Sequence, residues 1–380
     1  MKNLAKRESM VERPAYRAIR DYAAKLGYKD IIYLNIGEPD FPTPPNIIEA
    51  AKKAMDEGFT HYTEERGLRE LREVLASRIS SEREVEVDAD GILVTNGSAE
   101  GIFVILMSLV DPDDEVIIIK PYYPPYLYCV RIVSGKPVFI QPEVETLTPN
   151  PESIKAAVTD KTKAIIVNSP CNPTGVVYNE EILKTINDLA TDHGFYVISD
   201  EVYDKFVYDE EYHSIASYDK TLEHTIIVNS FSKTYAMTGW RIGYLACRSD
   251  LASRILKVKG TVNVCASSIS QKAAIEALRN SSGHVKMMLA EYAKRREFIL
   301  EALSKLPKIR LVTPKGAFYV FPDISQIEKD SLKFTMWLLE KAHVVVSPGV
   351  AFGMNGYIRI SYASSMENLK NAMDRIARVL

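Results

Sequence analysis

Short apolar stretches alternate with helical ones from Gly91 to Lys233, and this alternation limits the folds that the chain can adopt. The stretches rich in β-branched residues are expected strands, at residues 92–95, 115–119, 137–141, 163–167, 196–199 and 226–228. Between two of them, Asn179 can cap a helix that has its apolar residues on one face and that Gly194 can end. Apolar strands that alternate with helices predict a mainly parallel sheet covered by helices on both faces. The expected fold class is α/β.

The flanking parts of the chain follow other patterns. An arm and a helix near residues 16–27 precede a rigid, proline-rich loop at 36–45 and a helix at 46–57. The later part begins with a largely helical region and a long charged helix. The ranges expected there are helices at 249–280 and 284–306 and strands at 309–312, 317–321, 344–346 and 357–360. The last helix begins with a predicted capping box of Ser364 and Glu367.

Composition and charge argue against several classes of protein. A net charge of −3 gives no electrostatic reason to expect a nucleic-acid partner. The longest apolar stretch, 101–110, is far shorter than the roughly 20 residues of a membrane helix, and residues 1–7 lack the apolar core of a signal peptide. The four cysteines are far apart, and the chain has no Cys-x-x-Cys pair and no clustered histidines. We therefore expect a cytoplasmic protein with reduced cysteines, no metal site and enough chain for two domains.

A lysine, Lys233, follows the strand at 226–228 among groups that bind anions. Ser230 and Ser232 supply hydroxyls, and Arg241 supplies a guanidinium eight positions after the lysine. An amine beside anion donors suits a phosphate-bearing aldehyde, although a lone lysine after a strand is more often a solvated surface residue. The run from Ser230 to Lys233 also fits the Ser-x-x-Lys motif of serine acyl-enzymes, but the Lys-Thr-Gly that accompanies that motif is absent from the chain.

This stretch and four others resemble the motifs of the class I pyridoxal-phosphate-dependent aminotransferases, which have the aspartate aminotransferase type of fold (fold type I). After Lys233 comes the family's Gly-Trp-Arg-Ile-Gly, at 239–243. The other matches are Asn35-Ile36-Gly37-Glu38-Pro39-Asp40-Phe41, Asn172-Pro173-Thr174-Gly175, Asp200-Glu201-Val202-Tyr203 and Arg359-Ile360-Ser361. They occur in the family's order and extend over nearly the whole chain.

The resemblance implies a two-domain enzyme that transfers amino groups. A large cofactor-binding domain at 46–282 would hold a mainly parallel central sheet sandwiched by helices, and residues 1–45 and 283–380 would form the N-terminal arm and a smaller α+β domain. The implied reaction moves an amino group between an L-amino acid and a 2-oxo acid, through a Schiff base of pyridoxal 5′-phosphate (PLP) with Lys233 and ping-pong ketimine chemistry. The resemblance also implies a homodimer with shared active sites, and we expect neither nucleic-acid nor membrane partners.

The resemblance further assigns roles to single residues. Lys233 would hold the cofactor and move a proton between the substrate Cα and C4′ of the cofactor. Asp200, just past the end of a buried strand, would keep the pyridine nitrogen protonated. The other expected cofactor contacts are Asn172 and Tyr203 at the phenolic oxygen, Tyr123 at the ring face, and Gly97, Ser98, Ala99, Ser230, Ser232, Arg241 and the partner subunit's Tyr62 at the phosphate. The residues expected to contact the substrate are Gly37, Tyr123, Asn172 and, at its α-carboxylate, Arg359.

Ala99 departs from the family pattern, because many relatives specific for acidic substrates carry a basic residue at that position. A preference for aspartate is therefore open, and the arginines of the N-terminal arm that could replace the missing cation are Arg13, Arg17 and Arg20. The motifs also do not separate a transaminase from a PLP-dependent β-lyase or synthase on the same fold. An aminotransferase-like regulator with a DNA-binding helix-turn-helix is disfavoured, because the Gly37 loop lies within the first 40 residues.

Overall fold

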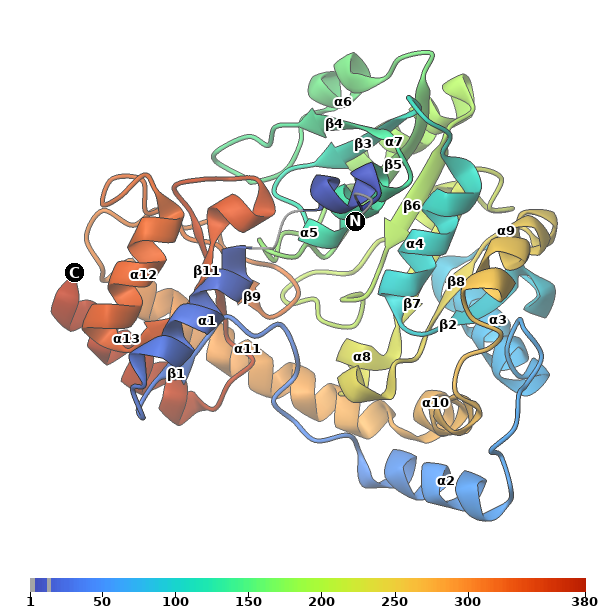
Figure 1. The fold of residues 1–380 in the computed structure, drawn as a ribbon, viewed down its shortest axis with the longest axis horizontal. Helices are drawn as coiled ribbons and strands as arrows, with labels where there is room; N and C mark the ends of the chain where they lie inside the picture. The colour runs from blue at the N-terminus through green and yellow to red at the C-terminus, as the bar shows by residue number, and fades with distance from the viewer. Residues whose placement is uncertain (1–3, 12–14) are drawn as a thin grey trace.

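A seven-stranded sheet forms the centre of the larger part of the molecule (Figure 1). The structure is a computed structural model that describes residues 4–11 and 15–380, without the side chains of residues 16, 17 and 20. The strands of the sheet are β2 (Ile92–Thr95), β3 (Glu115–Ile119), β4 (Lys136–Ile140), β5 (Thr162–Asn168), β6 (Tyr196–Asp200), β7 (Thr225–Ser230) and β8 (Gly243–Ala246). They lie in the order β2-β8-β7-β6-β5-β3-β4, and β8 runs antiparallel to both of its neighbours while the other pairs are parallel. The mainly parallel sheet expected from the sequence is confirmed.

Helices cover both faces of this sheet. Side chains alternate between the two faces along each strand, so each face carries apolar residues that a helix can cover. In β3, Val116 and Ile118 belong to one apolar core, whereas Ile117 and Ile119 belong to another on the opposite face. One face carries α4 (Ser98–Leu109), α5 (Pro124–Ile132) and α9 (Ser249–Val262), and the other carries α3 (Arg69–Arg83), α6 (Pro151–Ala157), α7 (Glu180–His193) and α10 (Ser268–Asn280), with α2 (Pro45–Asp56) packed on α10. The caps predicted for α7 are confirmed, since the Asn179 side chain accepts from the N–H of Ile182 and Gly194 is left-handed.

A second core joins the two ends of the chain. β1 (Ile32–Tyr33) pairs in parallel with β10 (Val344–Val345), so the N-terminal segment packs on the C-terminal part. The other elements of this part are α1 (Ala15–Leu26), α11 (Ser282–Ser304), α12 (Ser331–Ala342), α13 (Met366–Val379) and the antiparallel strands β11 (Ser347–Pro348), β12 (Ile358–Ser361) and β9 (Tyr319–Val320). Tyr203 and Phe206, which follow β6, also belong to this second core. The two parts of the molecule therefore meet beside the end of β6.

Two local expectations are wrong. Residues 309–312 do not form a strand, because only Arg310 makes an isolated bridge, to Asp323. The last helix is capped by Ser365 rather than Ser364: the Ser365 hydroxyl accepts from the N–H of Asn368, and the chain becomes helical at Met366. Adjacent serines are equivalent as cap formers, and the packing of α13 decides which of them stands at the helix start.

Within the described ranges 4–11 and 15–380, no helix combines the length and the apolar character needed to cross a membrane. The four cysteines are free thiols, of which Cys171 and Cys247 are buried. Burial raises the pKa of the Cys171 thiol to about 11. The Cys171 thiol is consequently protonated and unreactive near neutral pH.

Candidate active site

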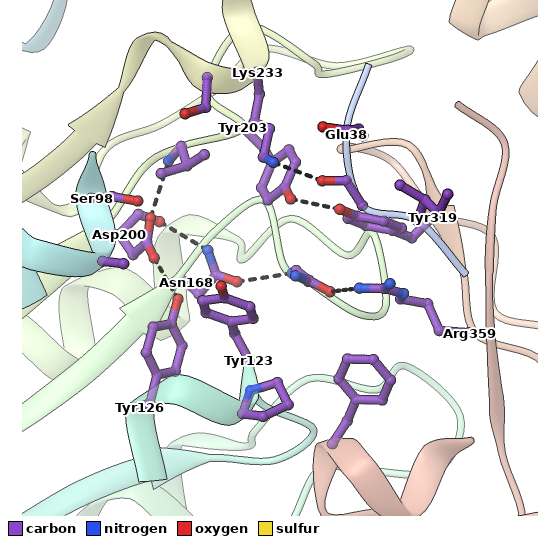
Figure 2. A pocket seen from close by; sticks show the side chains of 18 of the residues that line it. Glu38, Ser98, Tyr123, Tyr126, Asn168, Asp200, Tyr203, Lys233, Tyr319 and Arg359 are labelled. Atoms are coloured by element: carbon purple, nitrogen blue, oxygen red, sulfur yellow. Dashed lines mark hydrogen bonds between the residues drawn. The ribbon is translucent and has the colours of Figure 1, made fainter. Parts of the chain in front are cut away.

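A cavity of about 740 Å³ opens between the two cores, at the carboxyl ends of β5 and β6 and beyond β7. The carboxyl ends of parallel strands are where open α/β sheets bind ligands. The expected site residues that line the cavity are Gly37, Ser98, Ala99, Tyr123, Asn172, Asp200, Tyr203, Ser232, Lys233, Arg241 and Arg359. Figure 2 shows Asp200 and Arg359 on opposite sides of it, with Lys233 and Tyr203 between them. Residues far apart in the sequence thus share one site.

Asp200, the last residue of β6, presents a buried carboxylate to the cavity. The Tyr126 hydroxyl donates to Asp200 Oδ2 at 2.6 Å, and the Val202 N–H donates to Oδ1 at 3.3 Å. Burial raises the pKa of Asp200 to about 6, and these two donors oppose the rise. Both donors are neutral, so the carboxylate would be stabilised by a cation placed in the cavity.

Lys233 lies in α8 (Phe231–Thr234), the short helix that follows β7, and its Nζ donates to the carbonyl oxygen of Gly37 at 2.6 Å. Burial lowers the pKa of this amine to about 8, and the positive charges of Arg359 and Arg241 act in the same direction while Glu38 opposes them. A minor fraction of the amine is therefore already neutral near physiological pH. A neutral amine is the nucleophilic form that attacks a carbonyl group.

One end of the cavity is suited to an anion. Ser98 begins α4, a twelve-residue helix, where unpaired N–H groups and the helix dipole favour negative charge. Gly97 precedes it with a φ of 84°, and a Cβ at this position would lie 2.7 Å from Nη2 of Arg241. Ser230 lies behind Ser232 and donates to its Oγ at 2.8 Å. Gly97 and Ser230 thus pack against lining residues without lining the cavity themselves.

The opposite side of the cavity carries a buried arginine. Arg359, in β12, donates through Nη1 to Asn172 Oδ1 at 2.9 Å and through Nη2 to the carbonyl oxygen of Asn35 at 2.7 Å. Its guanidinium group lies between the rings of Tyr319 and Phe352, with its carbon 4.5 Å and 5.0 Å from their centroids. A guanidinium held in one plane is the group that best recognises a carboxylate by two parallel hydrogen bonds.

The turn after β6 faces the cavity with some of its residues and a buried arginine with others. Asp200, Val202 and Tyr203 line the cavity, whereas Glu201 and Asp204 form buried ion pairs with Arg83 of α3. Arg83 Nε donates to Glu201 Oε2 at 2.8 Å, and its Nη2 donates to Asp204. The turn that presents the cavity residues is thus held on its other side by a buried arginine.

The structure also shows residues that the sequence did not single out. Tyr126 and Tyr319 line the cavity, the first through its bond to Asp200 and the second beside Arg359. Tyr126 lies in the tyrosine-rich run at 122–128, where a ring can equally well belong to a core, and Tyr319 lies in an apolar stretch that carries no signal of a site. Tyr62 is 83% exposed and is not among the residues that line this cavity. Arg13 and the side chains of Arg17 and Arg20 lie outside the described residues.

Comparison with known proteins gives consistent findings. The family described as "Aminotransferase class I and II" matches residues 29–376. An aspartate aminotransferase of Pyrococcus horikoshii is 41% identical over 99% of this chain and 97% of its own length, and an aspartate/prephenate aminotransferase of Thermus thermophilus is 40% identical over 100% and 99%. Among solved structures, an aspartate aminotransferase from Thermus thermophilus with maleate has a TM-score of 0.96 at 39% identity and covers 100% of both chains. An aromatic aminotransferase from Pyrococcus horikoshii has a TM-score of 0.90 at 42% identity, over 95% of this chain and 98% of its own.

Proposed function

Because the chain belongs to the class I and II aminotransferase family and is a PLP-dependent transaminase of fold type I, we propose that its reaction takes place in the cavity lined by Lys233, Asp200 and Arg359. The reaction moves an amino group between an amino acid and a 2-oxo acid. One observation carries the proposal: a single cavity holds a partly neutral amine, a buried carboxylate and a buried guanidinium group. Neither the described residues nor the relatives named above favour the β-lyase or synthase alternative.

The residues present fit PLP at both of its ends. The hydrogen-bond donors on Asp200 are a phenol and an amide, and a protonated pyridine nitrogen would supply the cation that this buried carboxylate lacks. At the other end, the start of α4 with Ser98 and Ala99, the hydroxyl of Ser232 and the guanidinium of Arg241 offer the donors that a phosphate needs. Gly97 lets Arg241 approach closely, and Ser230 orients Ser232.

The chain's own side chains perform the remaining tasks. When bound, PLP supplies an aldehyde that condenses with amines and a protonated ring that draws electrons from the substrate Cα. Asp200 would hold the proton on the ring nitrogen, Tyr203 and Asn172 would donate to the phenolic oxygen, and Tyr123 would lie against the ring. Lys233 would anchor the cofactor and, as a free amine, would serve as the base and acid that moves the substrate Cα proton.

Arg359 would bind the α-carboxylate that every amino acid and 2-oxo acid substrate carries. Asn172 and the backbone at Gly37 border the same place. Asn172 accepts from the Arg359 guanidinium, and the Gly37 backbone is packed against the side chain of Tyr319. Among the described residues that line the cavity, the cationic side chains are Lys233, Arg241 and Arg359, and each has a role under this proposal. Relatives named as aspartate aminotransferases make aspartate the first amino donor to test.

The experiment that tests the function uses half-reactions of the PLP-loaded enzyme. Aspartate, alanine and an aromatic amino acid are added in turn, and the cofactor absorbance is followed together with release of the 2-oxo acid. We expect conversion of the cofactor to its amine form in step with release of the 2-oxo acid, and recovery of the starting spectrum on addition of 2-oxoglutarate. Release of the acid without a change in the cofactor would instead indicate an eliminating enzyme.

The proposal includes a homodimer in which Tyr62 acts on the partner's cofactor. Its support is the exposed phenol, which is 83% exposed on this chain and lies in a segment like the one that reaches the partner's phosphate in similar enzymes. A heterodimer of Lys233→Ala with Tyr62→Phe tests it. If Tyr62 acts in trans, both lesions fall in one site and the lysine-bearing site binds PLP with normal affinity. Weakened binding at the lysine-bearing site would assign Tyr62 to its own subunit.

Two broader features belong to the same proposal. We propose a large domain at 46–282 and a small domain formed by 1–45 and 283–380, supported by a core in which Ile32 and Leu34 pack with residues from Met288 to Ile376. A cytoplasmic location is supported by four free cysteines. Limited proteolysis would test the domain division, and fractionation of cells would test the location.

A further inference from the structure

Tyr319 lies at the point where the cofactor side and the substrate side of the cavity meet. It is the first residue of β9, pairs with Ser361 of β12, and is fully buried apart from its contact with the cavity. Figure 2 shows its side chain between Tyr203 and Arg359. Its ring and its hydroxyl make different contacts, so the two parts can be considered separately.

The hydroxyl of Tyr319 forms a hydrogen bond with the hydroxyl of Tyr203, at 2.7 Å between the oxygens. The two rings also meet edge to face, with centroids 5.6 Å apart. The Tyr319 oxygen is packed against Gly37, where a Cβ would lie 2.7 Å from it. The carbonyl oxygen of Gly37 in turn accepts from Lys233 Nζ. The Tyr319 hydroxyl is therefore held in place on two sides.

Two phenols that share one hydrogen bond have two protons, and only one of them can lie between the oxygens. Among the described residues, the hydrogen bond recorded for the Tyr319 hydroxyl is the one to Tyr203. If Tyr203 donated to Tyr319, the Tyr319 proton would have no acceptor among the described residues, because its oxygen is packed against Gly37, and an unpaired donor is costly. If Tyr319 donates to Tyr203, both protons are satisfied once the cavity supplies an acceptor, and the Tyr203 proton points into the cavity.

The ring of Tyr319 supports Arg359. The guanidinium carbon lies 4.5 Å from the ring centroid, in the range of a cation–π contact. This contact needs the aromatic face and not the hydroxyl. Removing the hydroxyl alone therefore leaves Arg359 supported, whereas removing the ring does not.

We propose that Tyr319 is a positioning residue with two separable parts: its hydroxyl turns the proton of Tyr203 toward the cofactor, and its ring holds Arg359 in place for the substrate carboxylate. The inference rests on the proposed role of Tyr203 at the phenolic oxygen of the cofactor. A donor to Tyr203 makes Tyr203 a stronger donor in turn, because hydrogen bonds in a chain polarise one another. The negative charge on the phenolic oxygen is then better stabilised, and the cofactor–lysine linkage loses its proton at lower pH.

The test of the hydroxyl is a pH titration of the absorbance of PLP bound to Lys233. In Tyr319→Phe we expect the midpoint to rise by about 0.5 to 1 pH unit relative to the unmodified enzyme, as the loss of one hydrogen bond implies. Tyr203→Phe should raise it further, and Tyr319→Phe should add nothing in that background, because its effect passes through Tyr203. The matched control is Tyr208→Phe, which also loses a buried phenol bond of 2.7 Å, to the carbonyl oxygen of Ala317, away from the cavity. Its midpoint should not move.

The test of the ring compares two variants by their KM values. Tyr319→Phe should keep KM for amino acid and 2-oxo acid within about twofold, and Tyr319→Leu should raise both by about fivefold through the loss of the cation–π contact. A midpoint in Tyr319→Phe equal to that of the unmodified enzyme, or additive shifts with Tyr203→Phe, would overturn the inference. If the unmodified enzyme forms no absorbing linkage with PLP at Lys233, it is the proposed function that fails, so the two failures are distinguishable.

Discussion

One wall of the cavity carries Asp200 and Lys233, which lie at the ends of neighbouring strands of one sheet. The opposite wall carries Gly37 and Arg359 and joins the two ends of the chain. Asp200 is the register partner of Asn168 in β5, and β7, which leads to Lys233, pairs with β6. Arg359 instead donates to the carbonyl oxygen of Asn35, which is 324 residues away in the chain. The first wall is positioned by the ladders of one large sheet, whereas the second combines the short ladders of β1 with β10 and of β11 with β12 with side-chain contacts between distant segments.

This difference suggests a division of tasks between the walls. The groups that act on protons lie on the first wall, where the ladder and the ion pairs of Arg83 restrict movement of the backbone. The group expected to recognise the substrate carboxylate lies on the second. Changes in the first wall should therefore act mainly on chemistry and stability, and changes in the second mainly on substrate affinity.

The largest effect should come from Lys233→Ala, which removes both the anchor and the proton carrier. We expect turnover to fall by about ten-thousandfold while the protein stays folded and still binds PLP without a covalent link. Borohydride reduction of the unmodified enzyme and peptide mapping should label Lys233. The control is Lys205→Ala, which removes an amine outside the cavity lining. This variant should keep the turnover of the unmodified enzyme and still carry the label on Lys233. A label on any other lysine would contradict the assignment.

Asp200→Asn should slow the single-turnover rate by about a thousandfold, because a neutral amide does not hold a proton on the ring nitrogen. The affinity for PLP should fall as well. Stopped-flow absorbance after mixing with amino acid measures the rate. Rates within about tenfold of the unmodified enzyme would show that another acid holds the ring.

Arg83→Met examines whether the first wall depends on its buried ion pairs. The substitution leaves Glu201 as a buried carboxylate without a cation and Asp204 with Lys205 alone, 3.7 Å away, so we expect the free energy of unfolding in urea to fall by about 3 kcal/mol or more. Arg69→Met, which breaks the exposed pairs with Glu73 and Asp90, is the control and should cost much less. Equal losses in the two variants would mean that the cluster behind Asp200 contributes no more than a surface pair.

Arg359→Lys addresses the second wall. A point charge cannot reproduce the planar fork, so we expect KM to rise by about tenfold to fiftyfold for every amino acid and 2-oxo acid, as the loss of one charge-assisted hydrogen bond implies, with a smaller change in kcat. Alanine and aspartate should be affected alike if Arg359 binds the α-carboxylate. An effect confined to aspartate would instead assign Arg359 to a side-chain carboxylate.

The smallest effect concerns the pH dependence of Lys233. Its Nζ joins the two walls, because it donates to the Gly37 carbonyl oxygen. The pKa of Lys233 is lowered to about 8, so its neutral fraction grows as pH rises through that value. The rate at which the cofactor-free enzyme captures PLP should then increase about tenfold from pH 7 to pH 9 and level off above. A rate that keeps rising with unchanged slope to pH 10 would mean an ordinary lysine.

The sequence alone determined the α/β class and most elements of the large sheet, because apolar alternation and helix caps are local signals. Asn179 and Gly194 mark the ends of α7 where expected. The resemblance of its motifs to those of the aminotransferase family also indicated which residues meet at the cavity, and the structure brings Gly37, Asp200, Lys233 and Arg359 together.

The tertiary structure decided what depends on contacts between distant segments. Tyr126 becomes the partner of Asp200 because α5 packs on the large sheet beside β6. Tyr319 becomes the neighbour of Tyr203 and Arg359 because β9, β12 and the turn after β6 pack together. A tyrosine in an apolar stretch gives no local signal that separates a core ring from a site ring. Packing likewise chose Ser365 over Ser364 as a cap and left 309–312 without a strand partner. Local patterns fix local structure, whereas the pairing of distant side chains is fixed by how the whole chain buries its apolar surface.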